Sequence, residues 1–122
     1  MMWIGFVGGP ASSDQTIIDS QSKAKMVVVS WYGEELHGSP MANGERFDKR
    51  DPTTVAHKEL PFGTLVELTN PETGQTLTVE VRDRGPFARG RTFDLSEAGA
   101  EKLGFKDKGV TSLESRVVLQ PD

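Results

Sequence analysis

Apolar and polar residues alternate most clearly in 75–82, where Leu77, Val79 and Val81 are separated by polar positions. This period of two predicts a strand with one buried and one solvated face. The apolar segment 64–70 precedes it, and the connection 71–74 (PETG) is rich in turn formers. Together they predict a β-hairpin.

The β-branched and aromatic run 26–32 predicts a buried strand, and the pattern adds short strands at 53–56, 92–95 and 113–119. Ser96 is expected to cap a short helix that ends at Gly104. About six short strands and one short helix favour an all-β fold, closed as a barrel, over a two-layer α/β fold.

The N-terminal segment, residues 1–25, is predicted to be a flexible leader or linker, because 8–25 is small, polar and without apolar period. Residues 26–120 are predicted to form one domain, as the length of 122 residues suggests. The first seven residues are apolar but carry no basic group, so an export signal is not evident. No apolar stretch is long enough to span a membrane.

Composition removes several classes of function. The net charge of −4, the pI near 5.2 and the scattered basic residues argue against nucleic-acid binding. The absence of cysteine excludes disulfides, thiol catalysis, cysteine-bound zinc and a lipidated cysteine. A monomer is the default expectation. No metal or organic cofactor is required, and Glu45, Asp48 and His57 are the residues that could in principle form an oxygen-rich metal site.

Candidate chemistry lies in the loops. The segment 33–52 is long for a compact domain and carries Glu45 and Asp48, three residues apart. Asp83 directly follows the alternating strand, and His57 ends another predicted strand. Carboxylates brought together at strand ends would suit glycosidic chemistry, which needs a proton donor and a proton acceptor.

Each candidate also has a structural interpretation. Acidic residues in turns often cap their own backbone, Asp83 can pair with the arginines beside it, and His57 can bond a neighbouring strand. The loop-flanking residues Phe47, Phe62 and Phe87 suit either the apolar face of a sugar ring or the core. Composition and spacing alone leave the function undecided.

Three ordered blocks resemble the rare lipoprotein A (RlpA) family. The first comprises 30–33 (SWYG), 37–38 (HG) and 42–48 (ANGERFD); the second comprises 56–57 (AH) and 60–64 (LPFGT); the third comprises 81–87 (VRDRGPF), 90–91 (GR) and 94–96 (DLS). The resemblance implies a six-stranded double-psi β-barrel, a scaffold shared with expansins and some endoglucanases.

The resemblance also implies an extracytoplasmic lytic transglycosylase that cleaves between N-acetylmuramic acid and N-acetylglucosamine in peptidoglycan, preferably where stem peptides have been removed. Asp83 is then the expected general acid, kept protonated by burial or by the like charge of Asp48. Glu45, Asp48 and His57 would complete the cleft, and Asp48 would also stabilise the developing cation. Asn43 and Arg84 would orient these groups or the sugar.

Two alternatives remain open. An expansin-like module would bind glycan or loosen the wall without catalysis, through an exposed row of aromatic residues. A hydrolase that inverts the anomeric centre would hold two carboxyl groups far enough apart to admit a water molecule.

Overall fold

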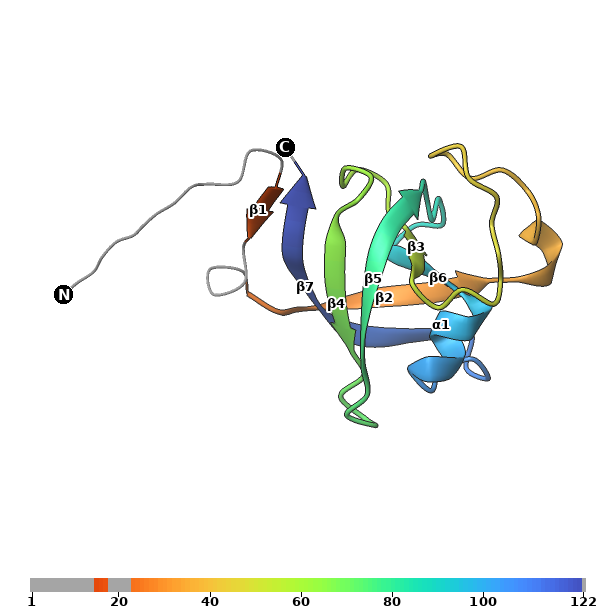
Figure 1. The fold of residues 1–122 in the computed structure, drawn as a ribbon. Helices are drawn as coiled ribbons and strands as arrows, with labels where there is room; N and C mark the ends of the chain where they lie inside the picture. The colour runs from red at the N-terminus through yellow and green to blue at the C-terminus, as the bar shows by residue number, and fades with distance from the viewer. Residues whose placement is uncertain (1–14, 18–22, 122) are drawn as a thin grey trace.

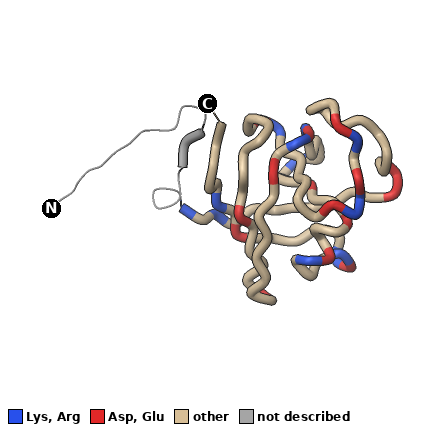
Figure 2. Tube along the Cα trace, in the orientation of Figure 1, with Lys and Arg blue, Asp and Glu red and all other residues tan. Residues whose placement is uncertain are grey.

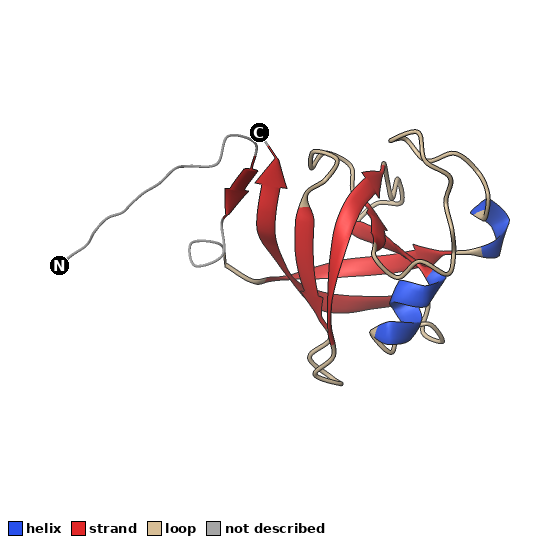
Figure 3. Ribbon diagram, in the orientation of Figure 1, coloured by secondary structure: helices blue, strands red, loops and turns tan. Residues whose placement is uncertain are grey.

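The computed structural model describes residues 15–17 and 23–121 and is built mainly from strands (Figure 3). The strands are β1 (Gln15–Ile17), β2 (Lys25–Tyr32), β3 (Thr54–Ala56), β4 (Leu65–Thr69), β5 (Thr76–Asp83), β6 (Phe93–Ser96) and β7 (Val110–Pro121). One α-helix, α1 (Glu97–Lys102), follows β6, and a short 3₁₀ turn, Glu34–Leu36, follows β2.

Six of the strands close on themselves as a barrel. Their order is β7-β2-β6-β3-β5-β4, and β4 pairs again with β7. The β2–β6 and β3–β5 pairs are parallel, and the other barrel pairs are antiparallel. In Figure 1 the long strand β7 bends so that its first half lies along β2 and its second half beside β4. The prediction of a six-stranded barrel with one short helix is confirmed.

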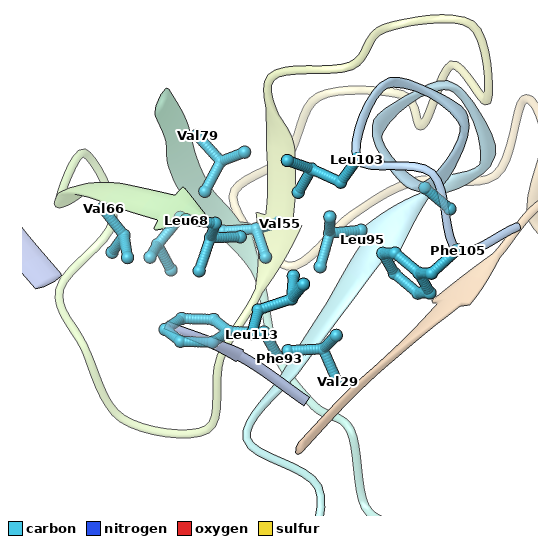
Figure 4. Close-up of a cluster of buried hydrophobic side chains, with 12 residues drawn as sticks. Val29, Val55, Val66, Leu68, Val79, Phe93, Leu95, Leu103, Phe105 and Leu113 are labelled. Carbon is cyan, nitrogen blue, oxygen red and sulfur yellow. The ribbon is translucent and has the colours of Figure 1, made fainter. Parts of the chain in front are cut away.

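The barrel interior is an apolar core to which every barrel strand contributes (Figure 4). Its fully buried residues include Val29, Val55, Leu68, Val81, Leu95 and Leu113. Leu103 and Phe105, which follow α1, are equally buried and belong to the same cluster.

The helix begins and ends where the sequence predicts. The Ser96 hydroxyl accepts the Gly99 N–H at 3.1 Å and so caps the helix. Gly104 follows the last turn with φ of +77°, a conformation that favours glycine.

The N-terminal segment differs from the expectation of a linker over residues 1–25. Its residues 15–17 form β1, which pairs with β7 at 119–121, and the first barrel strand begins at Lys25. β7 is twelve residues long and pairs with β2 only as far as Ser115, so its far end leaves an edge that β1 joins. The rest of the predicted leader, 1–14 and 18–22, lies outside the described residues. Within the described part of the chain, no helix has the length and apolar character needed to cross a bilayer.

The core predicts a strong contrast between two leucines. Leu68→Ala should lower the free energy of unfolding by about 3 kcal/mol, because Leu68 is fully buried and its loss leaves a cavity. Leu36→Ala should cost about 0.5 kcal/mol or less, since Leu36 is 40% exposed in a loop. Urea unfolding followed by circular dichroism measures both values, and equal losses would contradict this assignment of the core.

Candidate active site

A row of four paired residues crosses one end of the barrel wall. Ser30 of β2 pairs with Asp94 of β6, Asp94 pairs with Ala56 of β3, and Ala56 pairs with Asp83 of β5. Side chains at paired positions project from the same face of a sheet. The carboxyl groups of Asp83 and Asp94 therefore stand on one face, with the small side chain of Ala56 between them.

A shift in register puts Asp83 on that face. Val55 pairs with Val81 inside the core, whereas the next residue, Ala56, pairs with Asp83 rather than with Arg82. In an unbroken strand Asp83 would share the inward face of Val81, two residues earlier. The extra residue reverses the alternation and turns Asp83 outward.

Three donors hold the Asp83 carboxylate. Oδ1 accepts the backbone N–H groups of Ala42 at 2.9 Å and Arg84 at 2.8 Å. Oδ2 accepts the Tyr32 hydroxyl at 3.1 Å. These three hydrogen bonds fix the position of the carboxyl group.

The first long loop is fixed over this face by apolar contacts. Met41 and Phe47 of the loop form a buried cluster with Tyr32 and Ala56 of the barrel. The rings of Phe47 and Tyr32 stack with centroids 4.5 Å apart. Because Tyr32 also bonds Asp83, packing of the loop and placement of the carboxylate are directly connected.

Asp94 is the second carboxyl group of the site, and it is half-buried. Burial raises its pKa above the ordinary value, and the charges of Asp83 and Glu35 raise it further, against the Ser30 hydrogen bond and Arg91. Burial and the Asp83 carboxylate likewise raise the pKa of Tyr32, whose phenol therefore remains a neutral donor. The site thus combines a carboxylate held by donors with a carboxyl group that retains its proton to higher pH.

The Arg82 side chain lies on the outer face of β5, where other groups than this carboxyl pair bind it. Its guanidinium donates to Thr54 at 2.7 Å and bonds Glu80 at 3.1 Å and Asp51 at 3.3 Å. Among the described residues no lysine, arginine or histidine forms an ion pair with Asp83. The loop nearby carries charges of both signs (Figure 2).

Comparison with known sequences identifies the family. Residues 24–114 match the family described as lytic transglycolase, a range that covers most of the barrel. The chain belongs to this family. It is an RlpA-like double-psi β-barrel, as the three sequence blocks predict.

Curated relatives agree with this assignment. The probable endolytic peptidoglycan transglycosylase RlpA of Synechocystis sp. is 45% identical over 91 residues, 75% of this chain and 28% of that protein. The Aquifex aeolicus protein of the same name is 47% identical over 89 residues, 73% of this chain and 39% of that protein. Endolytic peptidoglycan transglycosylase RlpA of Pseudomonas aeruginosa is 41% identical over 96 residues, 79% of this chain and 28% of that protein. The RlpA-like chain thus spans between 28% and 39% of these relatives.

Solved structures share the barrel. The Streptomyces papain inhibitor superposes with a TM-score of 0.63 at 26% identity, covering 79% of this chain and 94% of the inhibitor. An expansin from Clavibacter michiganensis gives a TM-score of 0.60 at 21% identity, covering 79% of this chain and 50% of the expansin. The expansin likeness concerns the fold alone.

The acidic residues predicted in the first loop do not touch Asp83. Asp48 accepts the Arg50 N–H at 2.9 Å and lies 3.9 Å from the His37 ring, so it caps its own turn. Glu45 is exposed and lies 3.9 Å from Arg82. Asn43 accepts the Glu45 N–H at 2.9 Å, and its own N–H donates to the Arg82 carbonyl, which ties the loop to the end of β5.

The backbone of His57 adjoins the site, because its N–H donates to the Asp83 carbonyl at 3.2 Å. Its ring lies elsewhere, since Nδ1 accepts the N–H groups of Glu59 and Leu60, each at 3.0 Å, and the ring packs on Phe93 at 5.0 Å. Burial lowers the pKa of His57.

Arg84 and the three predicted aromatic residues occupy different environments. The Arg84 guanidinium donates to the carbonyls of His57 and Leu60 and lies 4.0 Å over the Phe62 ring. Phe62 is 38% exposed and Phe87 is 82% exposed, so both can meet a ligand. Phe47 is 2% exposed and supports the loop instead.

Sequence reasoning assigned no role to Asp94 and placed Tyr32 in the core. Both residues lie within the three sequence blocks, Tyr32 in the first and Asp94 in the third. Their meeting with Asp83 depends on strand pairing, which local pattern does not reveal. Among the described residues, no three His, Asp or Glu residues, Glu45, Asp48 and His57 included, form a group suited to a metal ion.

The paired carboxyl groups predict an electrostatic link. Asp83→Asn should lower the pKa of Asp94, because it removes a like charge, while burial should keep that pKa above the ordinary value. Asp48→Asn should leave the Asp94 titration in place, since Asp48 is not among the groups that shift it. Carbon-13 NMR titration of the carboxyl groups distinguishes the two variants. An Asp94 titration that moves with Asp48 and not with Asp83 would refute the link.

Proposed function

We propose that this domain is a peptidoglycan lytic transglycosylase whose chemistry takes place at Asp83 and Asp94. The observation that carries the proposal is the pairing row, which sets two carboxyl groups in different environments on one face. Family membership and relatives named endolytic peptidoglycan transglycosylases support the choice of reaction. Pairs of carboxyl groups held in different environments are typical of acid–base sites.

The two environments favour a division of roles. Asp94 is suited to donate a proton, because burial and like charge keep it protonated to higher pH. Asp83 is suited to act as the anion, because three donors face its oxygens. Sequence reasoning made Asp83 the general acid and Asp48 its partner; the geometry favours Asp94 as the acid.

The proposed reaction proceeds by internal displacement. Asp94 gives its proton to the oxygen that bridges C1 of N-acetylmuramic acid and C4 of N-acetylglucosamine, and the C1–O bond breaks. The positive charge that develops at C1 is stabilised by the Asp83 carboxylate. The 6-hydroxyl of the muramic acid forms the new bond to C1 and passes its proton to Asp83. The products are a 1,6-anhydromuramic end and a free 4-hydroxyl.

Substrate contact outside the carboxyl pair is assigned to exposed groups. Phe62, backed by Arg84, and Phe87 offer apolar surfaces for sugar rings. Asn43, Glu45 and Asp48 line the loop beside the site and serve to orient it or the glycan. His57 holds the end of β5 through its backbone. A peptidoglycan substrate supports a location outside the cytoplasm, where we propose that the domain acts as a monomer on glycan freed of stem peptides.

Product analysis tests the reaction. Purified sacculi, intact and amidase-treated, should yield anhydromuramic ends by mass spectrometry. Asp83→Asn and Asp94→Asn should each reduce them at least about 100-fold, as expected for loss of an acid–base group. Asp107→Asn, at an exposed position outside the row, is the matched control and should retain activity.

The alternatives give different products. Reducing ends in place of anhydro ends would establish a hydrolase. Retained glycan binding without any cleavage would refute the enzyme and leave an expansin-like binding module.

The pH profile tests the division of roles. The rate should fall as pH rises through the raised pKa of Asp94, because the proton donor is then lost. Measurement of kcat/KM against pH in the unaltered protein and in Asp48→Asn should give the same alkaline limb. A shift of the alkaline limb in Asp48→Asn would indicate that Asp48 influences the pKa of the proton donor, contrary to this division of roles.

A further inference from the structure

A cavity opens at the end of the barrel where β2 and β6 begin. It has a volume of about 280 Å³. Its apolar wall includes Val27, Phe93 and Val117, which pack against the barrel core. The mouths of β-barrels are common places for small ligands.

The polar lining of this cavity is cationic. Lys23 and Lys25 line it and are exposed. Neither lysine has an ion pair or side-chain hydrogen bond among the described residues. No described acidic residue lines the cavity, so its lining carries positive charge without a matching carboxylate.

The wall formed by His57 contributes shape and no charge. Nδ1 is occupied as an acceptor of two backbone N–H groups, and the ring rests on Phe93. Burial lowers the pKa of this imidazole, so near neutral pH the lysines supply the charge.

The cavity and the carboxyl pair are back to back. Phe93 and His57 line the cavity, whereas the adjoining residues Asp94 and Ala56 belong to the pairing row on the other face. Successive residues of a strand point to opposite faces. A ligand in the cavity would therefore be separated from the glycan site by the β3–β6 pair.

We propose that this cavity is a binding site for a small carboxylate anion with an apolar body. The apolar body lies against Phe93, Val27 and Val117, and the carboxylate faces Lys23 and Lys25. This site is independent of the proposed glycan cleavage. The small volume favours a short acyl or aryl acid over a drug-sized ligand.

Titration with hexanoate, followed by amide NMR shifts of the whole chain, tests the site. Saturable shifts should centre on His57, Thr92 and Val117. Hexanamide is a neutral probe of the same size, and its affinity should be lower than that of hexanoate by a factor of at least about three. The affinity for hexanoate should also fall as salt is added.

Matched lysine variants test the charge. Lys23→Gln with Lys25→Gln should weaken hexanoate about three- to tenfold, the effect expected of two exposed charges. Lys102→Gln with Lys108→Gln removes the same charge from the exposed surface around α1 and should leave the affinity unchanged.

Three outcomes of the probe titrations would overturn the proposal. They are the absence of saturable shifts, shifts centred on Asp83 or Phe87, and equal binding of hexanoate and hexanamide. Equal weakening by both lysine pairs would likewise show a general effect of net charge instead of a site. None of these results bears on the production of anhydromuramic ends.

Discussion

The register shift between β3 and β5 decides what this end of the barrel can do. The pairing of Val55 with Val81 continues the core, and one residue later Ala56 meets Asp83. Without the extra residue, Asp83 would point toward the apolar interior, where an ionised carboxyl is costly to bury. With it, Asp83 turns to the outer face that Asp94 shares, and on the same face Arg82 bonds Thr54, Glu80 and Asp51. A small backbone irregularity thus brings Asp83 to the outer face, while the neighbouring Arg82 is bound by other partners.

The loop after β2 and the carboxylate it covers depend on each other. Phe47 stacks on Tyr32, the Tyr32 hydroxyl reaches Asp83, and the Ala42 N–H of the same loop reaches Asp83 as well. Burial of apolar side chains holds the loop against the barrel, and the hydrogen bonds to the Asp83 carboxylate fix its orientation. Asp83 therefore helps to order the loop, and the loop in turn supplies one of the donors that surround Asp83, as a preorganised site requires.

The elements that the sequence predicts well are those set by local pattern. The alternation in 75–82, the turn formers in 71–74 and the cap at Ser96 each act over a few residues, and all appear in the fold. β1 was not predicted, because a strand of three residues carries almost no periodicity and its pairing depends on the free edge of β7. The sequence did not predict a role for Asp94, because that role depends on its position beside Asp83, which lies two strands away in the sheet. Strand pairing across such distances, and a shift of one residue within it, leave no local signature.

The adjacent ends of the described chain have a mechanical consequence. Gln15 pairs with Pro121, so the two ends of the described chain lie side by side at one edge of the fold, away from the long loop in Figure 1. Tension applied through the two ends would break the residue pairs between β1 and β7 one after another, starting at Gln15 and Pro121. This contact has three residue pairs, while the barrel is closed by longer ladders. A tethered form of this domain would yield first at β1, and the row from Ser30 to Asp83 would bear load only afterwards.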